Sequence, residues 1–456
     1  MPYQSTNPFD GKTVKSFDDI NDAQLEAKLK AAQQCFDQAW RHKSFADRKA
    51  VLTRAAAIMR EREQAFAELI TIEMGKLIAQ SIGEVQLSAA ILDYDAEHAE
   101  AFLAPEKLST PKGEAVVESS PIGVLFGVEP WNYPYYQIAR FAAPNLMAGN
   151  VVMVKHASNV PQCALAFERL LEEAGAPTGA YTNLFISKDQ VGRVIDDDRI
   201  RAVALTGSEG AGAIVAERAG KNLKKSTLEL GGSEAFIVLD DADLDQAVKH
   251  AVSGRMGNSG QACTASERII VVDALADRFL EKFKAAMQAF EPGDPLDSKT
   301  TLAPLSSAQA LKTLLGQVEQ AVEHGARVLI GGQRIDGQPG AFMQPTILTD
   351  IQADNPTYSQ EFFGPVALFF RVADEAAAVA LANDSPFGLG GSVFTQDIDR
   401  GKRVARQIET GMVFINSAAV STPDLPFGGI KNSGYSRELS AAGIQEFVNK
   451  KLNRVN

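Results

Sequence analysis

The chain has 456 residues, 45% of them hydrophobic, so it can form more than one core, because a single core stops growing at about 250–300 residues. A formal net charge of −12 disfavours binding to nucleic acid or anionic lipid, and no run of about 18 apolar residues predicts a membrane span. The first residues show no basic stretch followed by an apolar one, so we expect a cytoplasmic protein that binds neither nucleic acid nor membrane.

The three cysteines, at positions 35, 163 and 263, are too few and too widely spaced to predict a disulfide framework. Cys35 and Cys163 recur with apolar residues at helical spacing, which favours packing in a core. With five histidines and no HExxH or CxxC pattern, the sequence predicts no metal site.

The N-terminal part of the chain has apolar residues spaced near the helical repeat of about 3.6. This spacing predicts helices over residues 22–40, over 44–76 and in a long stretch up to 103. We therefore expect the first hundred residues to be helical.

From about residue 115, short β-favouring runs alternate with helical segments, which predicts a parallel sheet flanked by helices. A second set of runs follows Gly232, which predicts a second α/β domain with a junction near this glycine. Residues 109–121 alternate polar and β-favouring residues, and the tail from about 436 to 456 lacks a core pattern of its own. Both could form an edge that pairs with another subunit. The predicted strands are 124–130, 151–157, 182–187, 200–208 and 226–232 before the junction, and 235–240, 268–273, 327–332, 345–350 and 365–372 after it.

Cys263 is the candidate nucleophile, because it closes a loop that contains Gly257 and Gly260 and lies outside any helical apolar stripe. Glycines let backbone N–H groups approach the sulfur, and a thiol becomes a nucleophile where its surroundings favour the thiolate. Taken alone, this residue also fits a packed structural cysteine.

Glu229 is the candidate general base, because it ends a β-favouring run directly before the pair Gly231-Gly232. If Cys263 forms a thioester, a partly buried carboxylate with a raised pKa can deprotonate the water that hydrolyses it. The alternative is an ordinary exposed or salt-bridged glutamate.

Asn132 lies in the segment 129–136, which is predicted to be a turn with Pro134 near the start of a helical run. Attack of a thiolate on an aldehyde forms an oxyanion, to which the Asn132 amide and the Cys263 backbone N–H could donate. Taken alone, Asn132 also fits a helix cap.

A phosphate-binding segment is predicted at 206–212, where Gly207 and Ser208 follow a strand and Gly212 lies in the next helix. The N–H groups and dipole of a helix start favour an anion, and Ser208 adds a hydroxyl donor. Because the spacing is not GxGxxG, a simple helix cap is the alternative. Lys155, at the end of a strand, could bind ribose hydroxyls.

On the predicted helix, Asn132, Tyr136 and Arg140 fall at i, i+4 and i+8, so we expect them to lie in a row along one face. Such a row could line a substrate tunnel, and the Arg140 guanidinium matches a carboxylate. No acidic residue lies near Arg140 in residues 138–145. The alternative is a surface or helix-end arginine.

Together, the GQxC motif ending at Cys263, the ELGG motif from Glu229, the PWN motif ending at Asn132 and the GSxxxG segment from Gly207 resemble the aldehyde dehydrogenase superfamily. The resemblance extends from residue 7 to the PFGGIKNSGYSRE segment and implies that these three residues act as nucleophile, general base and oxyanion donor. Glu229 distinguishes the chain from the branch that passes the acyl group to coenzyme A.

The fold that the resemblance implies is α/β, with a Rossmann-like NAD(P)-binding domain, an α/β catalytic domain and a small β oligomerisation element. The respective ranges are 1–104 with 122–231, 232–435, and 105–121 with 436–456. A homodimer or homotetramer is implied.

The cofactor implied by the resemblance is NADP or NAD. Trp131 and Glu361 would hold it, with Glu361 on the nicotinamide ribose and Phe363 packed near that ring. Ser158, three residues after Lys155, leaves room for the extra phosphate of NADP and supplies a donor. The alternative for Ser158 is that it starts the next helix.

Within the superfamily, the chain most resembles bacterial succinate-semialdehyde dehydrogenases, which place an arginine at Arg140 and a serine at Ser421. Phe427 would wall the substrate tunnel. The chain departs from some of these enzymes at Gly257, where they carry a second arginine, and at Ala265, where they carry a second cysteine. The sequence thus predicts oxidation of succinate semialdehyde; the alternatives are another aldehyde, or a non-catalytic structural protein that keeps the fold.

Overall fold

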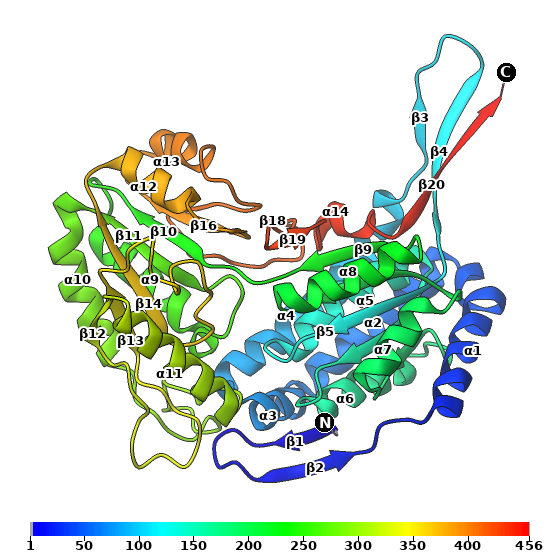
Figure 1. Cartoon of the computed structure of the whole chain (residues 1–456). Coiled ribbons are helices and arrows are strands. Elements are labelled where there is room, and N and C mark those ends of the chain that lie inside the picture. The colour runs from blue at the N-terminus through cyan, green and yellow to red at the C-terminus, as the bar shows by residue number, and fades with distance from the viewer. Residues whose placement is uncertain (1–2, 456) are drawn as a thin grey trace.

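The computed structural model describes residues 3–455 (Figure 1). A six-stranded sheet and a seven-stranded sheet form two lobes, and a three-stranded sheet extends away from both. The predicted α/β class is confirmed, since parallel strands alternate with helices in both large sheets. Within residues 3–455, no helix is long and apolar enough to cross a membrane.

The N-terminal segment begins with an antiparallel hairpin, which the helical expectation for the first hundred residues missed. Its strands are β1 (Tyr3–Thr6) and β2 (Thr13–Phe17). The predicted helices then follow, and α1 begins where Asn21 and Gln24 form a capping box. They are α1 (Asp22–Gln38), the short 3-10 helix η1 (Trp40–His42), α2 (Phe45–Glu61), α3 (Glu63–Met74) and α4 (Ile78–Phe102).

The first lobe is built on a sheet of order β19-β9-β8-β5-β6-β7, in which β5 to β9 are parallel. Its strands are β5 (Val124–Glu129), β6 (Val151–His156), β7 (Tyr181–Asn183), β8 (Ile200–Thr206), β9 (Lys225–Glu229) and the antiparallel β19 (Gly434–Tyr435). The connecting helices are α5 (Pro134–Ala148), α6 (Pro161–Glu173), α7 (Lys188–Asp196) and α8 (Glu209–Lys221). The carboxyl ends of the parallel strands therefore meet at one edge.

The second lobe contains the sheet of order β12-β13-β14-β11-β10-β16-β17, in which only β12 is antiparallel. Its strands are β10 (Glu234–Val238), β11 (Ser266–Val272), β12 (Arg327–Ile330), β13 (Thr346–Thr349), β14 (Val366–Val372), β16 (Gly391–Phe394) and β17 (Phe414–Ile415). The helices are α9 (Leu244–Met256), η2 (Gly257–Gly260), α10 (Asp273–Gln288), α11 (Ala308–Glu323), α12 (Glu375–Asn383) and α13 (Ile398–Ala405). A separate short pair joins β15 (Phe387–Gly388) to β18 (Ile430–Lys431).

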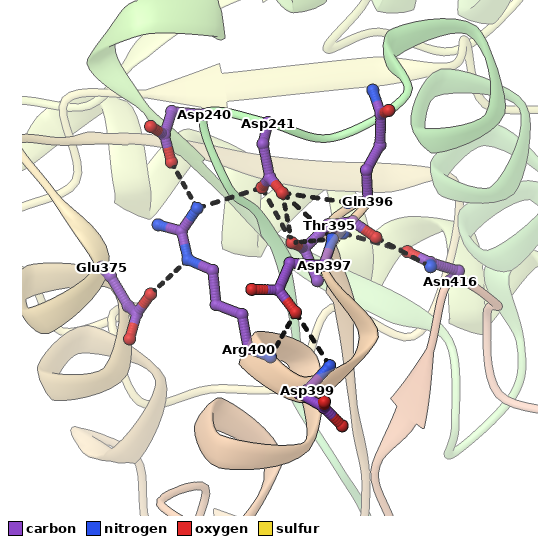
Figure 2. Close-up of polar contacts among 9 residues, drawn as sticks. All are labelled: Asp240, Asp241, Glu375, Thr395, Gln396, Asp397, Asp399, Arg400 and Asn416. Atoms are coloured by element: carbon purple, nitrogen blue, oxygen red, sulfur yellow. Dashed lines mark hydrogen bonds and ion pairs between the residues drawn. The ribbon is translucent and has the colours of Figure 1, made fainter.

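Arg400, on α13, ties together elements at the carboxyl ends of β10 and β16 (Figure 2). Its guanidinium pairs with Asp240 at 2.8 Å, with Asp241 at 3.1 Å and with Glu375, at the start of α12, at 2.6 Å. The Asp241 carboxylate in turn accepts a hydrogen bond from the Thr395 hydroxyl, just after β16, at 2.8 Å. One cation thus holds two strand ends and two helices in place.

The protruding sheet consists of β3 (Glu106–Leu108), β4 (Glu114–Pro121) and β20 (Val448–Val455), with α14 (Ser440–Ile444) preceding the last strand. β20 pairs antiparallel with β4 from Val448↔Pro121 to Val455↔Glu114. The two chain segments that were predicted to form an edge therefore meet in one sheet. The side chains of Leu452 and Val455 in this sheet are exposed.

Candidate active site

A cavity of about 290 Å³ lies where the carboxyl ends of β8 and β9 meet loops of the second lobe. It brings Cys263, Glu229 and Asn132 together from three separate segments, as the sequence predicted. The predicted cofactor residues Trp131, Gly207, Ser208, Glu361 and Phe363 line the same cavity.

The loop that carries Cys263 is held by unusual backbone conformations. Asn258 and Ser259 are both left-handed, with φ of 53° and 52°. The Asn258 amide donates to the backbone oxygens of Asn132 at 3.0 Å and Gln261 at 3.1 Å, so it joins the loop to the turn before α5. A β-carbon on Gly232 would lie 2.5 Å from the Cys263 carbonyl oxygen, so the loop can approach the end of β9 only because this position is glycine.

The Cys263 thiol is protonated in its surroundings. Burial raises its pKa to about 12, the Arg140 guanidinium opposes the rise, and the carboxyl groups of Glu361 and Glu229 add to it. The residue nevertheless keeps partial contact with solvent at the cavity. Because the thiolate is the nucleophile, a base must remove the thiol proton before attack.

Asn132 is buried and fixed at three points. Its Nδ2 donates to the Gln261 carbonyl at 3.1 Å, its Oδ1 accepts from Gln137 Nε2 at 3.5 Å, and its backbone oxygen accepts from Asn258. An amide nitrogen carries two hydrogens, so the second is available to an oxyanion.

The prediction that Asn132, Tyr136 and Arg140 form a row along one helix face is wrong for Asn132. α5 begins at Pro134 with Tyr133 as the N-cap, so Asn132 lies before the helix and does not cap it. The proline fixes the helix start, because its ring is compatible with the first position and its missing N–H is not needed there.

Glu229 ends β9 and is 3% exposed. Burial raises its pKa well above the usual value, the Glu438 carboxylate adds to the rise, and Arg140 and Arg437 oppose it. Neither carboxyl oxygen has a hydrogen-bond partner within residues 3–455. A β-carbon on Gly428, whose φ is +148°, would lie 2.7 Å from Glu229 Oε1, so this glycine leaves room for the carboxyl group.

Arg140 has an acidic partner that the sequence neighbourhood did not reveal. Its guanidinium forms a buried ion pair with Glu438 and is 1% exposed, so the surface alternative is excluded. It also donates to the Tyr136 hydroxyl at 3.2 Å and to Thr206 Oγ1 at 3.3 Å, and it lies 4.5 Å from the centre of the Phe427 ring. The arginine thus lies beside the catalytic cavity with its charge already balanced.

The remaining predicted substrate residues gather around Arg140. Phe427 and Ser421 line a separate cavity of about 200 Å³, together with the exposed apolar side chains of Val420 and Leu425. Burial raises the pKa of Tyr136, while Arg140 and a hydrogen bond with Ser421 oppose the rise. Phe427 thus lines this cavity and also lies against the Arg140 guanidinium.

The predicted cofactor residues at the first cavity include an open helix start and an apolar wall. Ser208 is the N-cap of α8, which was the alternative to a phosphate-binding role. Residues 208–211 are also exposed, so the start of the helix is open to a phosphate. Glu361 Oε1 accepts from the Gly232 N–H at 3.0 Å, and burial raises its pKa to about 8. Trp131 and Phe363 meet edge to face at 5.7 Å and form an apolar wall.

Three other predicted cofactor residues lie away from this cavity. Lys155 Nζ lies 5.5 Å from the centre of the Tyr3 ring, and Ser158 borders a separate groove near the N-terminal hairpin. Ser158 lies before α6 and does not start it. Gly212 is buried in α8 against Leu230. Their roles towards a cofactor stay predictions.

Sequence reasoning missed several residues that build the site. Asn258 and Gln261 both precede the nucleophile within six residues. Each has an amide side chain and is adjacent to a glycine, and this pattern could have marked them as residues that build the loop. Glu438 gave no such signal, because only the fold brings it to Arg140. Among residues 3–455, no group of three or more histidine, cysteine, aspartate or glutamate side chains is arranged to hold a metal ion.

Comparison with known proteins agrees with this geometry. The model of the aldehyde dehydrogenase family matches residues 1–453. The Deinococcus radiodurans protein named succinate-semialdehyde dehydrogenase (NADP+) is 52% identical over 453 residues, which cover 99% of this chain and 94% of that protein. A Mycobacterium tuberculosis protein named succinate-semialdehyde dehydrogenase (NADP+) 1 is 44% identical, and 99% of each chain is covered.

A solved structure is equally similar. Succinic semialdehyde dehydrogenase from Streptococcus pyogenes, in complex with NADP+, superposes with a TM-score of 0.98 at 49% identity and covers 99% of each chain. With the cysteine, glutamate and asparagine in one cavity, these matches settle the assignment: this chain belongs to the aldehyde dehydrogenase family.

Proposed function

We propose that this aldehyde dehydrogenase oxidises succinate semialdehyde to succinate with NADP, through a thioester on Cys263. The observation that carries the substrate is the buried Arg140 guanidinium, which donates to the Tyr136 hydroxyl beside the catalytic cavity; Tyr136 in turn lies within hydrogen-bond reach of Ser421. A guanidinium offers paired donors to a carboxylate, which is the group that succinate semialdehyde carries opposite its aldehyde. The names of the two relatives and of the solved structure support the same substrate and cofactor.

In the first half of the reaction, Glu229 removes the thiol proton and the Cys263 sulfur adds to the aldehyde carbon. The new oxyanion accepts from the free Asn132 N–H and from the Cys263 backbone N–H. A bound oxidised nicotinamide supplies the hydride acceptor and a positive ring charge. Loss of hydride from the former aldehyde carbon leaves the thioester.

In the second half, once Glu229 has passed the thiol proton on to solvent, it takes a proton from water, and the hydroxide adds to the thioester carbon. The carbon–sulfur bond then breaks, succinate leaves, and the sulfur is released for the next turnover. The raised pKa of Glu229 makes it a stronger base than an exposed carboxylate, which suits both proton transfers.

For the cofactor, we propose that Trp131, Glu361 and Phe363 hold the nicotinamide end and that Gly207 and Ser208 hold a phosphate at the start of α8. Lys155 and Ser158 would lie at the ribose that carries the extra phosphate of NADP. The small Ser158 side chain and its hydroxyl donor favour NADP over NAD.

We propose that residues 1–104 and 122–231 bind the cofactor, that 232–435 carry the nucleophile, and that 105–121 and 436–456 assemble a homodimer or homotetramer. The separate sheets support this division except at β19 (Gly434–Tyr435), which lies within 232–435 but pairs with β9 in the sheet of the first lobe. The exposed edges and apolar side chains of the protruding sheet support its role in assembly.

A second candidate substrate is an uncharged aldehyde, and the Arg140–Glu438 ion pair favours it, because the guanidinium is already neutralised. Succinate semialdehyde and butanal have the same chain length and differ in the carboxylate, so they form a matched pair. The variant Arg140→Met and the double variant Arg140→Met/Glu438→Gln should be compared, since the second leaves no buried carboxylate without a partner.

If Arg140 binds the substrate carboxylate, both variants should lower the ratio of kcat/KM for succinate semialdehyde to that for butanal by about 10- to 100-fold, as expected for a lost charged hydrogen bond. A ratio that both variants leave unchanged would reject the carboxylate site. Wild-type activity on butanal but not on succinate semialdehyde would favour the second candidate.

A further inference from the structure

One face of helix α4 contacts both segments that form the oxyanion site. Gln80 Oε1 accepts from the Asn258 backbone N–H at 3.2 Å, in the loop of the nucleophile. One helical turn later, Glu84 Oε1 accepts from the N–H groups of Tyr135 at 2.8 Å and Tyr136 at 3.3 Å, in the first turn of α5. Helix α4 thus holds both the nucleophile loop and the start of α5.

Glu84 replaces the cap that α5 does not supply for itself. In the described chain, the N-cap Tyr133 makes no side-chain capping bond, and Pro134 has no N–H. Tyr135 and Tyr136 therefore carry the first free N–H groups, which are the ones that a cap normally satisfies. A carboxylate at this end also interacts favourably with the helix dipole.

Lys76 holds Glu84 in place. The two side chains form an ion pair with no exposed surface on either one. Burial lowers the pKa of Lys76, and the charge of Glu84 opposes that change. Lys76 Nζ also lies 3.6 Å from the centre of the Tyr133 ring, so the pair contacts the residue that directly follows Asn132.

We propose that Glu84, secured by Lys76, is a positioning residue for the reaction: it sets the start of α5 and thereby the distance from Asn132 to the Cys263 loop that Gln80 holds. This inference rests on the proposed function. Glu84 does not line the cavity, so it acts on the reaction through the start of α5. The Asn132→Ala background distinguishes an effect that passes through Asn132 from one that passes through Tyr136 and Arg140 on the same helix.

The chain offers a matched control in Glu73, at the end of α3. Its carboxylate accepts from the N–H groups of Gln162 at 2.8 Å and Cys163 at 2.9 Å, in the first turn of α6. α6 also begins with a proline, Pro161, and Glu73 is fully buried. The two glutamates thus cap neighbouring helices in the same way, but α6 carries no residue of the catalytic cavity.

The test is the single-turnover rate of reduced-nicotinamide formation from succinate semialdehyde, expressed per folded chain. Glu84→Gln and Glu73→Gln are each measured in the wild-type background and in an Asn132→Ala background. Asn132→Ala alone should lower the rate by about 10²–10³-fold, as for the loss of an oxyanion donor.

Glu84→Gln should lower the rate by about 10-fold in the wild-type background, because a small misplacement of an oriented group is costly. In the Asn132→Ala background it should change the rate by less than about 2-fold, because coupled residues are not additive. Glu73→Gln should stay within about 2-fold in both. Melting temperatures would show whether the two variants lose similar stability.

Equal losses from Glu84→Gln in both backgrounds, or no loss in either, would overturn the proposal. If Glu84→Gln does not fold, Gln80→Ala leaves the buried ion pair intact and should show the same pattern with a smaller loss; additive losses there would overturn the proposal too. Absence of reduced cofactor from the wild type would instead reject the proposed function.

Discussion

The side-chain amide of Asn132 donates a hydrogen bond at 3.1 Å to the backbone carbonyl of Gln261, two residues before the nucleophile. This bond joins segments of the two lobes across the cavity. It also orients the second amide hydrogen before a substrate arrives. Donors that are fixed in advance need no reorganisation when the oxyanion forms, which is the largest contribution in many acyl-transfer sites.

The role of Glu229 predicts that Glu229→Gln separates the two halves of the reaction. Acylation can proceed once with another proton acceptor such as solvent, but water is no longer activated, so a burst of reduced cofactor should precede turnover slowed by about 10²–10⁴-fold. Rapid-mixing absorbance measurements would show the burst. A full steady-state rate would contradict the base role.

A matched control is Glu129→Gln. Glu129 ends β5, is 3% exposed, and burial raises the pKa of its carboxyl group as well, but it does not line the catalytic cavity. This variant should show no comparable block after the burst. If Glu129→Gln also blocks turnover after the burst, the block results from the loss of any buried carboxyl group and does not identify Glu229 as the base.

The raised pKa of Glu229 predicts the direction of a pH dependence. The group stays protonated above the usual glutamate value of about 4.3, and only its deprotonated form can accept a proton from water. Hydrolysis of the thioester should therefore accelerate with rising pH through a range above that value. Double-mixing kinetics would measure it, and a hydrolysis rate that does not change with pH down to about 5 would contradict the account.

Cofactor choice predicts the effect of Ser158→Glu. A carboxylate at this position would repel the extra phosphate of NADP but not the hydroxyl of NAD, so the kcat/KM ratio of NADP to NAD should fall by about 10-fold or more. Initial rates with both cofactors provide the measurement. An unchanged ratio would show that the phosphate does not lie near residue 158.

Arg400→Met should destabilise the second lobe. The substitution leaves Asp240, Asp241 and Glu375 without their shared cation, which should lower the free energy of unfolding by about 1–3 kcal/mol. Thermal unfolding would measure the change, with Arg403→Met on the exposed side of the same helix as the control. Equal melting temperatures for the two variants would contradict the linking role.

The sequence predicted well where structure is local. The strands that contain Lys155 and Glu229 are continuous β-favouring runs, and parallel topology follows from their alternation with helices. Cys263, Glu229 and Asn132 each allowed a structural alternative when taken alone, and the resemblance of their combined motifs to one family grouped them; the structure places all three at one cavity.

The features that the sequence did not predict depend on distant contacts or on glycine-rich strands. The predicted strands do not include residues 391–394, which begin with glycine, yet β16 lies between β10 and β17 in the sheet, because its neighbours supply the hydrogen bonds. The Arg140–Glu438 pair joins α5 to a segment near the C-terminus, and no local pattern predicts such a contact.

The most direct test of the central claim is to trap the thioester. Glu229→Gln is mixed with succinate semialdehyde and NADP, quenched in acid and analysed by peptide mass spectrometry. The account predicts a succinyl group on the peptide that contains Cys263, and neither that group nor reduced cofactor when Cys263 is also replaced by alanine. Formation of reduced cofactor by the double variant, or a succinyl group on Cys35 or Cys163 instead, would contradict it.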